Sequence, residues 1–173
     1  NKSDYRPELT AVLFKKDKTV ATDSFRLLEM TTDSSLKVEE YPIVEGNKIM
    51  RGFEPFMISA QKLKEVKIPK SNMPIANSLA VKFVDDSRVD LLTTDITNVN
   101  IKSFQRIAGK FPDYEAIIPQ GEARAEIDVN GEALAELLEI MSKLSIEKRV
   151  TLKFYGNKKP LVLIAKNDKQ SAR

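Results

Sequence analysis

Short strand-like segments joined by tight turns restrict the fold of this sequence more than any other feature. Such segments, apolar and rich in strand-forming residues, are predicted at 9–15, 19–22, 25–31, 78–86, 88–95 and 99–109. Parallel neighbours need a crossover connection of about a dozen residues, and most of these segments follow one another too closely to provide one. We therefore predict antiparallel sheets with helices on one face, an α+β fold.

Two segments are predicted to be helical. Residues 56–70 are interpreted as a strand that leads into a helix, which Ser59 caps and Pro69 ends. Asn130 is placed to cap a second helix over 130–144. Apolar residues of this second helix recur at helical spacing and form one stripe, namely Leu134, Leu137, Leu138, Met141 and Leu144.

The order of the predicted elements repeats along the chain. A strand at 125–129 precedes the second helix, and a hairpin over 149–156 and 159–167 follows it, with its turn at Gly156-Asn157. A series of three strands is thus followed by a βαβββ series and then by a βαββ series. This order indicates an internal structural repeat, although few residues are identical between the repeats.

Composition excludes several classes of function. The 173 residues include no cysteine and no histidine, so disulfides and nucleophilic catalysis of the Ser-His or Cys-His type are not available within this chain. We expect no zinc site of the conventional kind and no cofactor. No apolar run approaches the roughly 20 residues of a membrane span, so we expect no membrane association. The chain begins at Asn1 and not at a methionine, which leaves its completeness open.

Carboxylates supply one alternative function. Asp85, Asp86 and Asp95 are placed to hold a divalent metal ion for a hydrolase. Asp85-Asp86 also lies where a hairpin turn is predicted, and Asp favours turns because its side chain bonds to its own backbone. We favour the turn, and we predict neither catalytic nor metal-binding residues.

Lysines along the first predicted helix are candidates for contact with DNA, namely Lys62, Lys64, Lys67 and Lys70. Phosphate contacts need basic side chains. The second helix instead carries Glu132, Glu136 and Glu139 on its polar side. A charged helix face is usually only solvated, and the net charge of +3 does not by itself indicate a nucleic-acid partner.

Two further segments have ordinary interpretations when taken separately. Asp23 and Ser24 in "ATDSFRL" (21–27) suit a tight turn. The segment "KFPDYEAIIP" (110–119) suits a linker that Phe111 and Tyr114 anchor to the cores on either side.

Taken together with "RPELTAVLF" (6–14), and in this order and spacing, "VATDSFRLLEM" (20–30) and "KFPDYEAIIP" (110–119) resemble the bacterial DNA polymerase sliding clamp. The resemblance is to the middle domain of this family, the DNA polymerase III beta subunit, and to the linker that leaves it. It implies the DNA-clamp fold of repeated βαβββ units, with antiparallel sheets outside and helices on one face. It also implies a clamp domain at 1–119, with or without its first strand and helix, and a partial second clamp domain at 120–173.

The function that this resemblance implies is that of a cytoplasmic, non-enzymatic processivity factor in DNA replication. A homo-oligomeric ring of this kind encircles duplex DNA and tethers a polymerase. Topological attachment needs only weak, sequence-independent contacts to phosphates.

The resemblance further implies a surface pocket for short peptides of DNA polymerase, the clamp loader and repair proteins. Matched position by position, its residues are Arg6, Leu9, Thr22, Ser24, Phe25, Arg26, Leu27, Pro112 and Ile117. The aliphatic residues of this set supply apolar walls, and the two arginines supply donors at the rim. Asp23 is expected to hold the turn and not to touch a ligand.

Two positions depart from the family pattern. Phe25 stands where many members have His, and Ala116 stands where many have a basic residue, which makes the predicted pocket more apolar. The chain is also short for this family. We therefore keep a second alternative, a clamp-fold module that binds peptides without forming a ring.

Overall fold

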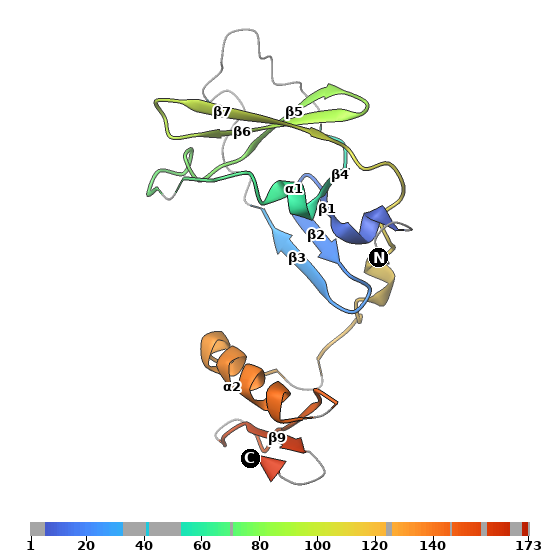
Figure 1. Cartoon of the computed structure of the whole chain (residues 1–173), viewed down its shortest axis with the longest axis vertical. Helices are drawn as coiled ribbons and strands as arrows, with labels where there is room; N and C mark the ends of the chain where they lie inside the picture. Colours follow the sequence, from blue (N-terminus) through green and yellow to red (C-terminus); the bar gives the residue numbers. More distant parts are fainter. Residues whose placement is uncertain are drawn as a thin grey trace. The chain divides into compact units, whose positions relative to one another are not determined.

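The computed structural model describes residues 6–32, 41, 53–69, 71–123, 126–145, 147–156, 159–166 and 171–172. The chain divides into two compact units, Asn1–Pro119 and Gln120–Arg173, which we call the first unit and the second unit (Figure 1).

A four-stranded antiparallel sheet opens the first unit. Its strands lie in the order β3-β2-β1-β4 (Figure 1), and they are β1 (Ala11–Phe14), β2 (Lys18–Thr22), β3 (Leu27–Thr31) and β4 (Phe56–Ser59). A 3-10 helix, η2 (Pro7–Thr10), precedes β1, and Pro7 suits its first position because no donor is lost there. The predicted strands at 9–15 and 25–31 are confirmed with shorter bounds, and the strand predicted at 19–22 is confirmed with Lys18 added.

A three-stranded antiparallel sheet completes the first unit, with the order β5-β6-β7. Its strands are β5 (Ala80–Asp85), β6 (Arg88–Thr94) and β7 (Val99–Gln105), and the turn between the first two is at Asp86 and Ser87 as predicted. A second 3-10 helix, η4 (Glu115–Ile117), follows in the linker.

The first predicted helix is much shorter than expected. Helix α1 covers only Ala60–Leu63, and Ser59 precedes it without a side-chain capping bond, so both the predicted cap and the predicted end at Pro69 are wrong. Turn-type bonds from Glu65 and Val66 to the carbonyls three residues earlier replace the helical pattern. The following Val66-Lys67-Ile68-Pro69 stretch is unfavourable for a helix, because β-branched residues lose rotamer freedom and the residue before proline avoids the α region.

Successive side chains of a strand point to opposite faces of the sheet, and the residues of β1 therefore contribute to two different cores of the first unit. Ala11 and Leu13 of β1 contribute to the first core, which also contains Val20, Met57, Phe111 and Tyr114. Phe14 points the other way, into the second core with Phe56, Ile58, Val89, Leu91 and Phe104. The second core draws residues from both sheets and therefore joins them. Phe14 and Phe56 stack within it, with 4.9 Å between ring centroids.

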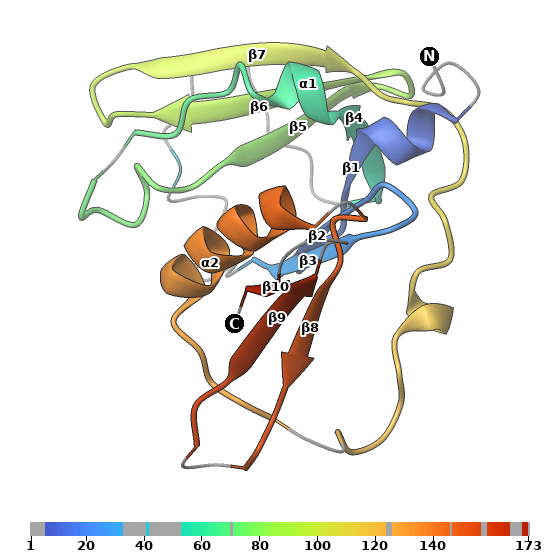
Figure 2. The same ribbon diagram turned by 60° about the horizontal axis from the view of Figure 1, so that its bottom comes forward.

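Among its described residues, the second unit combines one helix with one sheet. Helix α2 (Gly131–Leu144) lies beside the antiparallel strands β8 (Val150–Lys153), β9 (Val162–Lys166) and β10 (Ser171–Ala172), in the order β10-β9-β8 (Figure 2). The Asn130 side chain accepts a hydrogen bond from the Ala133 amide at 3.1 Å, so the predicted cap is confirmed. The predicted hairpin is confirmed too, and Asn157 lies outside the described residues.

One prediction for the second unit is wrong. Residues 126–129 form no strand. The apolar stripe of α2 is divided: Leu134, Leu138 and Met141 contribute to a third core with Leu163 and Ala165. Leu137 and Leu144 remain 49% and 40% exposed. The small sheet covers only part of a helix that is apolar over a wider arc.

Candidate functional site

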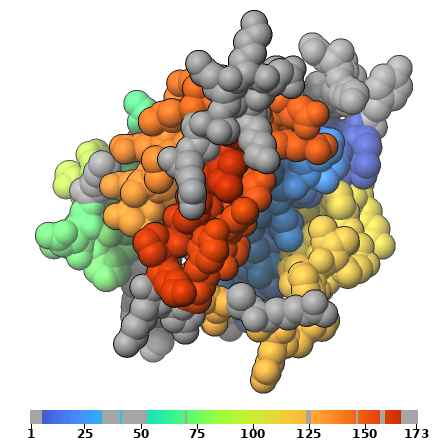
Figure 3. Space-filling view, turned by 90° about the horizontal axis from the view of Figure 1, so that it is seen from below, coloured from blue at the N-terminus to red at the C-terminus, as the bar shows by residue number. Residues whose placement is uncertain are grey.

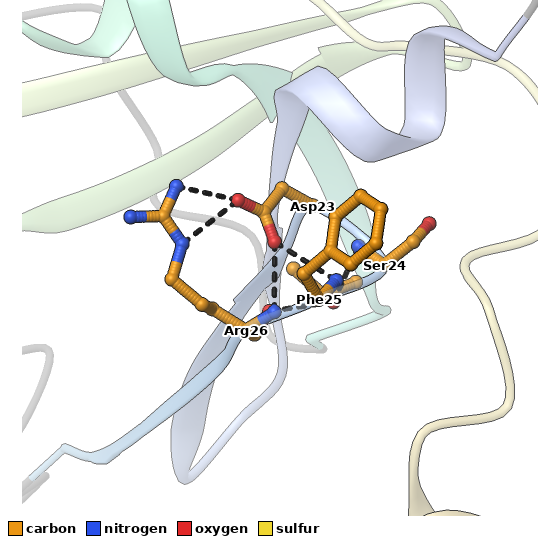
Figure 4. Close-up of polar contacts among 5 residues, drawn as sticks. Asp23, Ser24, Phe25 and Arg26 are labelled. Carbon is orange, nitrogen blue, oxygen red and sulfur yellow. Dashed lines mark hydrogen bonds and ion pairs between the residues drawn. The ribbon is translucent and has the colours of Figure 1, made fainter. Parts of the chain in front are cut away.

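A tight turn between β2 and β3 forms the centre of the predicted pocket (Figure 4). Asp23 Oδ1 accepts hydrogen bonds from the amides of Phe25 at 3.0 Å and Arg26 at 2.8 Å. Asp23 Oδ2 accepts from Arg26 Nε at 2.9 Å and also pairs with Arg26 Nη2. These donors, the guanidinium first, lower the pKa of the Asp23 carboxyl to about 2. The expectation that Asp23 holds the turn is confirmed.

The same turn occurs a second time in the first unit. Thr22 Oγ1 donates to the Arg26 carbonyl at 2.8 Å, and Thr94 Oγ1 donates to the Asn98 carbonyl at 2.8 Å. Asp95 accepts from the Asn98 amide as Asp23 accepts from the Arg26 amide. The residue after each aspartate has a positive φ, 74° at Ser24 and 83° at Ile96. The repeated Thr-Asp at 22–23 and 94–95 was the sequence signal for this duplication, and the sequence-based prediction missed it.

The linker after β7 packs against the same sheet as the turn. Phe111 and Tyr114 are buried in the first core, and Leu27 at the start of β3 packs against that core. The Lys15 ammonium donates to the Tyr114 hydroxyl at 3.1 Å and to Glu115 Oε1 at 2.7 Å. The prediction that the two aromatics anchor cores on either side of the linker is therefore wrong, because both belong to the first unit.

Helix η2 supplies the remaining predicted pocket residues. It contacts β1, β2 and β4, and Leu9 is half-buried in it. Arg6 Nε donates to Glu8 Oε1 at 3.0 Å. The pKa of Glu8 is lowered by its own backbone amide first and by Arg6 second. Both predicted rim arginines, Arg6 and Arg26, are therefore already paired with a neighbouring acid.

Exposure differs widely among the predicted pocket residues. Phe25 and Ile117 are 95% and 71% exposed, whereas Thr22, Leu27 and Pro112 are half-buried. The fold brings Leu27 to the linker residues that flank Pro112, and it brings η2 to β2, the strand that ends at Thr22. An apolar, exposed rim over a rigid sheet can receive an apolar side chain, because burying exposed apolar surface is favourable.

A hollow of about 550 Å³ lies elsewhere on the first unit, at the start of the linker. Its lining includes Pro55, Asp86, Arg106, Lys110 and Phe111, and none of the nine predicted pocket residues. Arg106 pairs with Glu54 at 2.7 Å and lies over the Phe83 ring. The sequence-based prediction missed this hollow, because its residues come from four separate segments.

The predicted DNA-facing lysines are not all on one helix. Lys62 lies in α1, and Lys64 and Lys67 follow it, all three exposed. Lys70 lies outside the described residues. An exposed basic stretch remains, but the regular helical face that was predicted is absent, because α1 ends at Leu63.

Two carboxylates that were considered for the alternative hydrolase, Asp85 and Asp95, accept hydrogen bonds within turns. Asp85 accepts from the Ser87 hydroxyl and amide and pairs with Arg88, and these donors, the Ser87 hydroxyl first, lower its pKa to about 2. Asp95 accepts from the amide of Asn98 at 2.6 Å. In the part of the chain that the structure describes, no three His, Cys, Asp or Glu side chains are grouped to hold a metal ion.

No helix among the described residues is long and apolar enough to cross a membrane.

Comparison with known proteins identifies the fold. No protein-family model and no curated protein matches the chain. Among solved structures, the beta subunit from DNA polymerase of Streptococcus pyogenes is similar over 98% of this chain, with a TM-score of 0.62 and 16% sequence identity. The match covers 42% of the Streptococcus chain, so this chain spans less than half of that protein's length. The predicted α+β clamp fold is thereby confirmed: these 173 residues have the fold of part of a DNA polymerase beta subunit.

Proposed function

We propose that this protein is a sliding-clamp-like processivity factor, which acts without catalysis in the cytoplasm. It encircles duplex DNA as an oligomeric ring and holds partner peptides in the pocket formed by η2, the turn at 22–27 and the linker. The first unit corresponds to the middle domain of the clamp family, and the second unit corresponds to part of the next domain.

The observation that carries this proposal is a fold likeness to a DNA polymerase beta subunit over 98% of the chain. The family-like segments support it further, because Leu27 and the linker aromatics meet at one core although about 80 residues separate them in the sequence. A fold can host several functions, so the peptide and DNA partners need their own tests.

Peptide binding is tested by fluorescence anisotropy of a labelled peptide of the Gln-Leu-x-Leu-Phe type. We expect saturable binding in the micromolar range, about −8 kcal/mol. Ile117→Asp is the informative variant, because this side chain is 71% exposed and its replacement leaves the cores intact. Leu27→Asp is less informative, because Leu27 packs against the first core and the substitution also perturbs folding.

The matched control is Ile68→Asp, which makes the same change at an exposed isoleucine (48%) outside the predicted pocket. Loss of binding with Ile117→Asp and retention with Ile68→Asp support the pocket. Equal binding by wild type and Ile117→Asp contradicts it.

Encirclement is tested on duplex DNA with free or blocked ends. A ring that has threaded onto linear DNA stays there at high salt when bulky caps close both ends, and it slides off when the ends are free. Equal retention on the two DNAs contradicts encirclement and favours the alternative, a clamp-fold peptide-binding module without a ring.

A further inference from the structure

The start of α2 contains the one Asn-Gly pair in this sequence, Asn130-Gly131. The backbone nitrogen that follows an asparagine can attack the side-chain amide carbon, and glycine hinders this attack least because it has no side chain. Both residues are exposed, and Figure 3 shows α2 (orange) at the surface. This pair is therefore accessible to water and to modification.

The fold does not explain the glycine at position 131. A Cβ added there meets no atom of the described residues within 4 Å, and Gly131 is not among the glycines with a positive φ. Glycine also stabilises a helix less than alanine does. Gly131 therefore makes the first turn of α2 easier to open, and helix ends are already among the parts of a protein that open most readily.

The cap of α2 opposes the attack while the helix is intact. Asn130 Oδ1 accepts a hydrogen bond from the Ala133 amide at 3.1 Å. In this capped conformation the ψ angle of Asn130 is 111°, which turns the Gly131 nitrogen away from the Asn130 side chain. The nitrogen reaches the side-chain carbon Cγ only after rotation about ψ, and that rotation breaks the capping bond. Modification of Asn130 thus requires the first turn of α2 to open.

We propose that Asn130 is a site of spontaneous deamidation, gated by opening of the first turn of α2. In the opened turn the Gly131 nitrogen gives its proton to water and bonds to Cγ of Asn130. The bond from Cγ to Nδ2 then breaks, and ammonia leaves. Water opens the resulting succinimide ring at either of its two carbonyls, so nothing is oxidised or reduced. Opening at Cγ gives aspartate at position 130, and opening at the backbone carbonyl gives isoaspartate.

The two products differ in their effect on α2. Aspartate at position 130 still caps the helix, and its negative charge is favourable at a helix N-terminus. Isoaspartate routes the main chain through the former side chain, which displaces the acceptors of the Ala133 and Leu134 amides. Only the isoaspartate product therefore loosens the start of α2. This inference goes beyond the proposed function and requires neither DNA nor a peptide.

Mass spectrometry of the tryptic peptide 125–143 follows the reaction in the full chain, because Asn130 is the one asparagine of this peptide. We expect the peptide to exchange an NH group for an oxygen atom during incubation, and chromatography separates the two products. Asn77, before Ser78, is the control within the same sample. Its side chain accepts from the Ser71 amide and donates to the Ser71 carbonyl, so it should remain intact over the same period.

Two variants separate the chemistry from the gating. Gly131→Ala keeps Asn130 and its cap, and it should slow the reaction several-fold both in the folded chain and in urea, because the added methyl group hinders ring closure. Ala133→Gly, at an exposed position, keeps the capping donor but weakens the first turn. It should speed the reaction in the folded chain and leave the rate in urea unchanged.

The gating itself predicts a difference between the folded and the unfolded chain. We expect wild type to react about tenfold more slowly when folded than in urea, which corresponds to an opening free energy of about 1.4 kcal/mol. Hydrogen exchange at the Ala133 amide should rise in the isoaspartate fraction of the incubated chain and not in the aspartate fraction.

Three results would overturn this inference. The first is an intact Asn130 in the folded chain over a period in which the chain in urea reacts. The second is an equal rate in both states, and the third is an unchanged rate in folded Ala133→Gly. None of these readouts depends on the peptide pocket or on DNA, so their failure is distinguishable from failure of the proposed function.

Discussion

The Lys15 ammonium lies 2.7 Å from Glu115 Oε1 and 3.1 Å from the Tyr114 hydroxyl, which ties the end of β1 to the linker helix η4. Lys15 and Glu115 are separated by 100 positions in the sequence. The hydrogen bond to Glu115 is the largest cause that raises the pKa of Lys15, and the hydrogen bond to Tyr114 is the second. Lys15 in turn is the main cause that lowers the pKa of Glu115. This contact fixes η4, which carries Ile117, relative to the turn at 22–27.

Replacement of this ion pair should loosen η4 and leave the sheets intact. We expect Lys15→Met to increase hydrogen exchange at the Ile117 amide, which donates to the Tyr114 carbonyl at 3.2 Å. The effect on global stability should be small, because exposed ion pairs contribute little. Lys16→Met, an exposed neighbour, serves as the control. Unchanged exchange in Lys15→Met would show that Phe111 and Tyr114 alone hold the linker.

The turn at 22–27 should depend on pH through Asp23. Its pKa falls from an ordinary 3.8 to about 2 in the folded chain, so its contribution to stability is fully present above pH 4. The contribution is lost as the pH falls from about 4 to about 2. Asp23→Asn should therefore be less stable than wild type at neutral pH and equally stable below pH 2. Urea unfolding at several pH values measures this, with Asp86→Asn as an exposed control. A difference that persists below pH 2 would show that the charge of Asp23 is not the cause.

Ile96 should be a site of backbone strain. Its φ of 83° is costly for a β-branched residue, and its side chain is 51% exposed, so little burial is lost on replacement. We expect Ile96→Gly to stabilise the protein by about 1 kcal/mol. The substitution relieves the backbone strain of the folded chain, and this gain is reduced by the greater conformational freedom that glycine gives the unfolded chain. Ile101→Gly, in strand β7, should destabilise it instead, because glycine weakens a strand interior. Thermal unfolding compares the two, and a lower midpoint for Ile96→Gly would contradict the assigned strain.

The exposed lysines after β4 should contact DNA phosphates. Replacing Lys62, Lys64 and Lys67 together with Gln should weaken binding to duplex DNA at low salt. The slope of log affinity against log salt should fall by about 0.9 for each phosphate that the variant no longer neutralises. The control replaces Lys16, Lys110 and Lys143, which are exposed too, and has the same net charge. Equal slopes in the two triple variants would mean that this stretch does not face DNA.

Local sequence signals predicted most of the fold. The tight turn at Asp86-Ser87, the cap at Asn130 and the alternating strands depend on contacts a few residues apart, so they are readable from the chain itself. Helix α1 was predicted too long, because the β-branched residues before Pro69 disfavour a helix, and residues 126–129 were predicted wrongly, because a strand depends on a partner distant in sequence. Val66 packs into the second core, and residues 126–129 have no paired strand among the described residues.

The candidate site was predicted only in part. The Thr-Asp-Ser-Phe-Arg segment indicated a turn, and the family resemblance indicated which segments accompany it. The ion pairs Arg6–Glu8 and Lys15–Glu115 were not predicted, because they depend on side-chain positions that only the folded chain sets.

The sequence by itself determined the antiparallel α+β fold, the turn chemistry of Asp23 and Asp85, and the absence of histidine and cysteine chemistry. Only the tertiary structure decided that Phe111 and Tyr114 share one core, that the small sheet covers only part of the apolar arc of α2, and that Ile127 and Val129 remain exposed. The physical reason is the range of the interactions. Turns and caps close over a few residues, whereas burial depends on which distant surfaces meet, and no local pattern specifies that.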